Sequence, residues 1–142
     1  FFVLTLFGFG YLSQAEASFT PIDRTGLIGV LKAADMNSTA DQAIPVRARR
    51  YAVRRIVVEN ASTSITTAVG GVYSTTSKGG DQIVANTQLY TALTAATKYL
   101  DLTLAAIATT DLRTETTLYL SLTTPQGGAA TANVWIFGDV LE

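Results

Sequence analysis

Two short segments of this chain alternate between leucine and mostly polar residues. Residues 98–104 and 116–123 each carry leucine at every second position, namely Leu100, Leu102, Leu104, Leu118, Leu120 and Leu122. Successive side chains of a β-strand point to opposite faces, so each segment predicts a strand with one buried and one hydrated face. A hydrated face is typical of antiparallel sheets, because parallel sheets are usually covered on both sides.

Four more segments have the composition of strands and are separated by turn-forming Gly, Asn, Ser and Thr: residues 51–59, 68–74, 82–85 and 132–141. Residues 89–96 fit either a strand or a helical turn. Within the second segment, Gly70 and Gly71 indicate a bulge or a close approach of two backbones. This spacing predicts an all-β fold, an antiparallel β-sandwich or jelly-roll-like domain over residues 46–142.

The last of these strands is apolar on both faces. Val134 and Ile136 share one face, whereas Trp135 and Phe137 occupy the other. We therefore expect this strand to be central in its sheet or covered by a neighbouring molecule. Trp135 is interpreted as a core or interface anchor, since buried and interfacial sites favour large aromatic side chains.

The first 45 residues are predicted to form an extended, apolar N-terminal arm and a connection to the domain. Residues 1–12 (FFVLTLFGFGYL) are almost wholly apolar, and the residues expected to contact a partner are Phe1, Phe2, Leu4, Phe7 and Phe9. Residues 18–45 contain Pro and Gly and are predicted to be an extended connection, in which 27–34 form one short helix or strand.

Three interpretations of this arm remain open. It packs on its own domain or a neighbouring subunit, which we favour, or it is an uncleaved signal or anchor, or it is an ordinary first strand. The Ala15-Glu16-Ala17 sequence resembles a signal-peptide cleavage site, but no positively charged segment precedes the apolar run. Twelve apolar residues are fewer than the roughly 20 of a membrane-spanning helix, so membrane contact is expected only through this segment.

The composition argues against catalysis and cofactor binding. The chain has no His and no Cys, which excludes disulfides, thiolate nucleophiles, the usual zinc sites and the commonest general base. The carboxylates are scattered; Asp111 and Glu115, which flank Arg113, are interpreted as surface charges or turn caps. We therefore expect no enzymatic activity, no cofactor and no metal.

Half of the ten Lys and Arg residues lie in one short stretch: Arg47, Arg49, Arg50, Arg54 and Arg55. On a strand, Arg47 and Arg49 would share one face, and Arg50 and Arg54 the other. We favour contacts with a protein partner or intrachain ion pairs, because Arg forms bidentate pairs with carboxylates. A solvated edge is the second interpretation. Nucleic-acid binding is disfavoured, since Tyr51 is the only interleaved aromatic and the net charge is −1.

Three segments resemble small structural proteins of tailed bacteriophages, including decoration and cement proteins: STADQAIPV (38–46), RRIVVENAS (54–62) and LYLSLTTPQGGAATANVWIFGDVL (118–141). The resemblance implies a homo-oligomeric β-sandwich on the capsid exterior. Its expected partners are the major capsid protein or other virion subunits, and its interface is predicted to include the apolar arm, the five arginines, Trp135 and Phe137.

Other functions remain open at this stage. The first is a secreted or surface fibre subunit that donates residues 1–12 as a strand to its neighbour. The second is a tail or connector subunit of a virion. An enzyme or a carbohydrate-binding β-sandwich is the least favoured.

Overall fold

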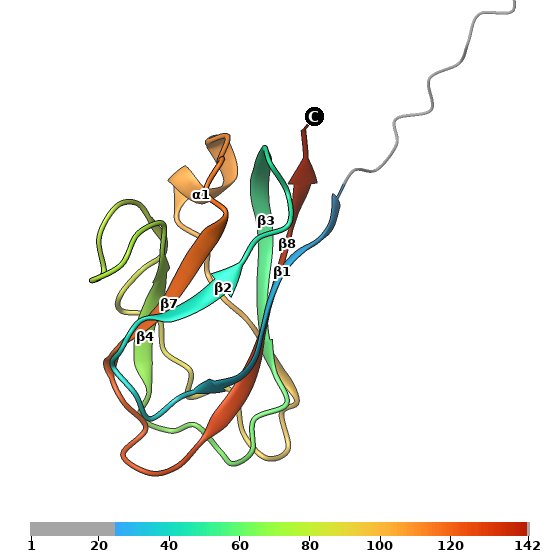
Figure 1. The fold of residues 1–142 in the computed structure, drawn as a ribbon. Coiled ribbons are helices and arrows are strands. Elements are labelled where there is room, and N and C mark those ends of the chain that lie inside the picture. Colours follow the sequence, from blue (N-terminus) through green and yellow to red (C-terminus); the bar gives the residue numbers. More distant parts are fainter. Residues whose placement is uncertain (1–24, 142) are drawn as a thin grey trace, which may run out of the picture.

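The computed structural model describes residues 25–141, which form a β-sandwich of two antiparallel four-stranded sheets (Figure 1). One sheet has the strand order β1-β8-β3-β6, with β1 at Thr25–Asp35, β8 at Thr131–Val140, β3 at Tyr51–Glu59 and β6 at Tyr99–Asp101. The other has the order β2-β7-β4-β5, with β2 at Gln42–Pro45, β7 at Thr117–Thr124, β4 at Val69–Tyr73 and β5 at Gln82–Val84. The predicted all-β sandwich is confirmed. The apolar arm, with Phe1, Phe2, Leu4, Phe7 and Phe9, lies outside the described residues.

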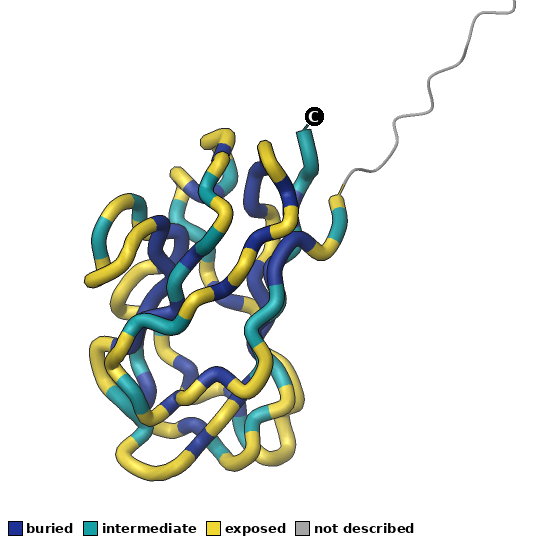
Figure 2. The backbone as a smooth tube through the Cα atoms, viewed as in Figure 1, coloured by how far each residue is buried: buried dark blue, intermediate teal, exposed yellow. Residues whose placement is uncertain are grey.

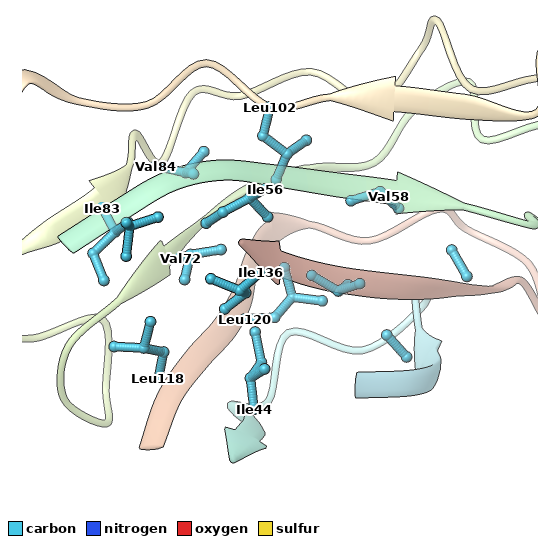
Figure 3. Packing of buried hydrophobic residues seen from close by; sticks show 14 of the residues in the cluster. Ile44, Ile56, Val58, Val72, Ile83, Val84, Leu102, Leu118, Leu120 and Ile136 are labelled. Atoms are coloured by element: carbon cyan, nitrogen blue, oxygen red, sulfur yellow. The ribbon is translucent and has the colours of Figure 1, made fainter. Parts of the chain in front are cut away.

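The core lies between the two sheets, where the alternating leucines of β7 are fully buried. Leu120 lies beside Ile136 of β8 (Figure 3), and both belong to one core cluster with Leu118 and with Ile56 of β3. Burying one such side chain contributes about 1.5–3 kcal/mol, so this layer is the main source of stability. Figure 2 shows the buried backbone positions along the strands and the exposed positions concentrated in the connections.

The last strand, β8, is central in its sheet, as its two apolar faces predicted. It pairs with β1 on one side and β3 on the other. Val134 and Ile136 enter the core, whereas Trp135 and Phe137 lie on the outer face and remain partly exposed.

The expected boundary between arm and domain is wrong for residues 25–45. β1 pairs with β8 from Thr25 to Asp35, and β2 pairs with β7, so the sandwich includes residues 25–45 as well. Two register shifts interrupt the pairing of β1, between Leu27 and Gly29 and between Leu31 and Ala34, and they remove a regular alternation from its sequence. Pro45 is tolerated because β2 is an edge strand.

The other leucine segment, 98–104, contains a shorter strand than expected. Only β6 pairs regularly with β3; the chain then crosses to the other sheet, where Leu104 forms a bridge with Val84. Leu102 is buried in the core, and Leu100 and Leu104 pack against its edge. A five-residue helix that the sequence did not predict follows: α1 (Ala106–Thr110).

The glycine pair of β4, Gly70 and Gly71, shows both a bulge and a close approach of neighbouring backbones, the two features that the sequence indicated. The register shifts between Val69 and Gly70, and a Cβ on Gly70 would overlap the backbone of Leu122 in β7. A Cβ on Gly71 would overlap the backbone of Val84 in β5. Both positions therefore need glycine because the neighbouring strands approach closely.

Candidate functional site

The outer face of the β1-β8-β3-β6 sheet carries an unusual set of partly exposed aromatic side chains. Residues paired across neighbouring antiparallel strands project from the same face of a sheet. Three cross-strand rows run from β1 toward β6: Leu27, Phe137 and Arg55; Val30, Trp135, Val57 and Asp101; and Asn133, Glu59 and Tyr99.

A hollow of 320 Å³ lies on this face, lined by Arg55, Val57, Glu59, Tyr99, Trp135 and Phe137. Val57 is the smallest lining side chain and only 7% exposed, so it forms the floor. Trp135 and Phe137 of β8 stand on one side, and Tyr99 of β6, 57% exposed, stands on the other. We call this hollow and its six lining residues the aromatic trough.

Charge at the rim of the aromatic trough is largely compensated. The Arg55 guanidinium donates two hydrogen bonds to Asp101, from Nε to Oδ1 (2.5 Å) and from Nη2 to Oδ2 (2.9 Å). These bonds hold the pKa of the Asp101 carboxyl below its usual range and raise the pKa of Arg55. Glu59 has no ion pair within residues 25–141, so the trough carries one uncompensated charge, which is negative.

The indole N–H of Trp135 is a second notable feature of the trough. Nε1 is buried and has no hydrogen-bond acceptor among residues 25–141. A buried donor without a partner costs about 1–3 kcal/mol. Phenylalanine would pack at this position without that cost, so folding stability alone does not explain a tryptophan here.

The five clustered arginines divide into two groups. Arg54 pairs with Asp139 (Nε–Oδ2, 2.5 Å) and Arg55 with Asp101, so the interpretation as intrachain ion pairs is confirmed for these two. Both side chains are exposed because the register shift between Val53 and Arg55 interrupts the alternation of β3.

The remaining three, Arg47, Arg49 and Arg50, are exposed and have no ion pair within the described part of the chain. We call them the basic end. Arg47 N–H bonds to Ile28 in β1, and Arg50 accepts a hydrogen bond from Leu141 N–H, so the basic end lies where β3 begins and β8 ends. The expected placement of these arginines on the two faces of a strand is wrong, because β3 begins only at Tyr51. Their binding to a partner stays a prediction, as it does for Trp135 and Phe137.

Sequence reasoning missed the most deeply buried charge of the described residues, Arg113. Its side chain is 1% exposed, and Nη1 lies 3.3 Å from carboxylate oxygens of both Asp81 and Glu115. Its Nε and Nη2 atoms are buried without a hydrogen-bond partner in this part of the chain. Glu115 therefore compensates a buried cation in addition to accepting a hydrogen bond from the Thr114 N–H, so its role goes beyond the expected surface charge or turn cap. Glu115 lies two residues from Arg113, so this partner was visible in the sequence, whereas Asp81 lies 32 residues away and had no local signal.

Tyr51 is tied to the same ion pair and is fully buried. Its hydroxyl donates to the backbone oxygen of Glu115 (2.9 Å), and its backbone pairs with Arg113. The pKa of the tyrosine hydroxyl is raised mainly by burial and to a smaller extent by the nearby negative charge of Glu115. Its ring is therefore part of the core and is not available on the surface beside the basic end.

Searches for other kinds of site and for relatives gave negative findings. Within residues 25–141, no group of three or more acidic side chains is placed to hold a metal ion. No helix in that range has the length and apolar character needed to cross a membrane. No protein-family model matches the chain, and neither curated proteins nor solved structures give a significant match.

Proposed function

We propose that this protein is a structural subunit of a bacteriophage virion, a decoration or cement protein that binds the outside of the head. The observation that carries the proposal is the basic end: three exposed arginines that have no carboxylate partner among residues 25–141, in a chain of net charge −1. Arginine is enriched at protein interfaces, where its planar guanidinium binds carboxylates in a bidentate manner. An acidic surface of the assembled shell is the complementary partner.

A protein partner fits the basic end better than nucleic acid does. Single-stranded nucleic acids are held by stacking of bases on aromatic side chains as well as by cationic groups. Tyr51 is the only aromatic residue in the arginine stretch, and its ring is buried in the core. The basic end therefore supplies cations without a stacking surface.

Stabilisation of the head would arise from many weak contacts repeated over the shell. Apolar burial contributes about 25 cal/mol per Å² before the costs of association, so each copy needs only a modest patch. Exposed Leu27 on β1 lies close to the basic end and would add apolar area. The first described residue, Thr25, lies at the same end, because it pairs with Asp139 near the end of β8.

The test is binding of the purified protein to heads that lack it, measured by co-sedimentation at low and high salt. We expect saturable binding that weakens as salt rises, because exposed charges are screened over about 10 Å at 0.1 M salt. The triple variant Arg47→Glu/Arg49→Glu/Arg50→Glu is expected to abolish binding. Its control, Lys32→Glu/Lys78→Glu/Lys98→Glu, makes the same change in net charge elsewhere and should bind normally. Wild-type protein that fails to bind heads, or equal loss in both variants, would refute the proposal.

A further inference from the structure

We propose that the aromatic trough is a binding site for neutral saccharides. This inference goes beyond the structural role proposed above and depends on different residues. It rests on three properties of the trough: the exposed or partly exposed aromatic side chains on its two sides, the hydrogen-bonding groups at its rim, and the near absence of uncompensated charge.

The aromatic side chains provide stacking surfaces of the right kind. A pyranose ring has an apolar face made of C–H groups, and the negative face of an aromatic ring attracts such partly positive hydrogens. Tyr99 stands on one side of the Val57 floor, and Trp135 and Phe137 stand on the other. Val57 and the three aromatic residues belong to paired strands, so the sheet holds the site in place and little ordering is required on binding.

The rim provides partners for hydroxyl groups. Glu59 offers a carboxylate that is free to accept hydrogen bonds, and the paired Arg55 and Asp101 offer further donors and acceptors. Because Arg55 is already neutralised by Asp101, Glu59 is the only one of the six lining residues whose charge has no ion pair within residues 25–141. The trough therefore favours a neutral ligand with hydroxyl donors and disfavours uronic acids, sulfated sugars and phosphates.

An extended peptide fits the trough less well. Val57 and Glu59 of β3 are paired on both sides, with Trp135 and Asn133 in β8 and with Asp101 and Tyr99 in β6. A peptide lying over the floor of the trough would therefore find no free backbone groups of β3 with which to pair, and buried peptide amides without partners are unfavourable. A volume of 320 Å³ also matches a small-ligand site rather than a protein interface, which buries about 800 Å² per partner.

The identity of residue 135 supports a role in binding. Its indole N–H has no acceptor among the described residues, so phenylalanine would satisfy the fold at least as well. Tryptophan offers the larger aromatic surface for stacking on a sugar ring. We therefore expect Trp135→Phe to fold with unchanged or higher stability and to bind saccharide more weakly, a combination that a purely structural role does not produce.

The test is titration of the full chain with neutral oligosaccharides of glucose, xylose, mannose and N-acetylglucosamine, with sulfated and uronic-acid oligomers as anionic comparators. Binding is followed by calorimetry and by fluorescence of Trp135, the only tryptophan of the chain. We expect at least one neutral series to bind and the anionic series to bind at least about tenfold more weakly. Tyr99→Ala and Trp135→Ala should each weaken binding by about tenfold or more. Tyr119→Ala removes a partly exposed tyrosine from the opposite sheet and should have no effect.

Three results would overturn the inference. The first is no binding of wild-type protein to any neutral series, and the second is binding that Tyr99→Ala and Trp135→Ala leave unchanged. The third is loss of head binding in those two variants without any saccharide binding, which would make the trough a protein interface. Failure of this site is distinguishable from failure of the proposed function, because the basic-end triple variant should lose head binding while keeping its saccharide affinity.

Discussion

The buried side chain of Arg113 leads to a counterintuitive prediction: removing its charge should not lower the stability of the protein. This side chain is 1% exposed, and among residues 25–141 only Nη1 has partners, at 3.3 Å from Asp81 and from Glu115. At an effective dielectric constant of about 20, unit charges at this distance attract by about 5 kcal/mol before desolvation is counted. The two carboxylates are 44% and 32% exposed, so water weakens this attraction further.

Removing the partners and removing the charge are expected to have opposite results. Glu115→Gln should cost about 1.5–3 kcal/mol, the contribution of a hydrogen bond to a charged group. Asp81→Asn/Glu115→Gln should cost about 3–5 kcal/mol, because it leaves a buried cation without compensation. Arg113→Met should be neutral or stabilising, since it removes the charge together with two buried nitrogens that lack partners, each costing about 1–3 kcal/mol.

Urea unfolding followed by Trp135 fluorescence measures all three variants. The free energy of unfolding falls by about 2 kcal/mol per M urea for a protein of this size, so the double carboxylate variant should lower the urea midpoint by about 2 M. The midpoint of Arg113→Met should match or exceed that of the wild type. Arg55→Met, the same substitution at an exposed ion pair, is the control and should leave the midpoint nearly unchanged. If Arg113→Met proves less stable than the double carboxylate variant, the reasoning about unpaired buried nitrogens is wrong.

Two further predictions concern the sheets and their surface charges. Gly70→Ala should lower the free energy of unfolding by about 1–3 kcal/mol or more, because the new Cβ overlaps the backbone of Leu122. The control is Gly128→Ala, whose Cβ meets open space; in a thermal melt it should unfold at the wild-type temperature. The second prediction concerns Asp101 and Asp139, whose carboxyl pKa values are held below the usual range by hydrogen bonds. The donor to Asp101 is Arg55, and the donors to Asp139 are Thr25, with the larger effect, and Arg54. The contribution of these two carboxylates to stability is present above the unfolded-state pKa and is lost as pH falls through the lower folded-state value. Asp101→Asn/Asp139→Asn should therefore flatten the loss of stability below about pH 4 in acid titrations of urea midpoints. An unchanged acid slope in that variant would contradict the assignment.

The sequence predicted those parts of the fold that follow from regular alternation. The leucines of β7 and the two-faced pattern of β8 identified a core strand and a central strand correctly. β1 was missed as a strand of the sandwich because two register shifts interrupt its alternation. Its glycines and the following Pro45 were interpreted as signs of a connection.

The candidate sites depended more strongly on tertiary structure. The aromatic trough combines residues from β3, β6 and β8, and only the strand order brings Tyr99 opposite Trp135. The arginine stretch was visible in the sequence, but its division into paired and unpaired members follows from the positions of Asp101 and Asp139 in neighbouring strands. Local composition cannot provide such long-range pairing.

The most direct test of the proposed virion role is an electron cryo-microscopy reconstruction of phage heads saturated with the purified protein, compared with heads that lack it. The account predicts one β-sandwich density per binding site on the outer surface, with Arg47, Arg49 and Arg50 facing acidic side chains of the shell. The saccharide proposal replaces the expectation that Trp135 and Phe137 contact the shell, so the aromatic trough is predicted to stay open. Heads without added density, or a sandwich seated on the shell through its aromatic trough, would contradict this account.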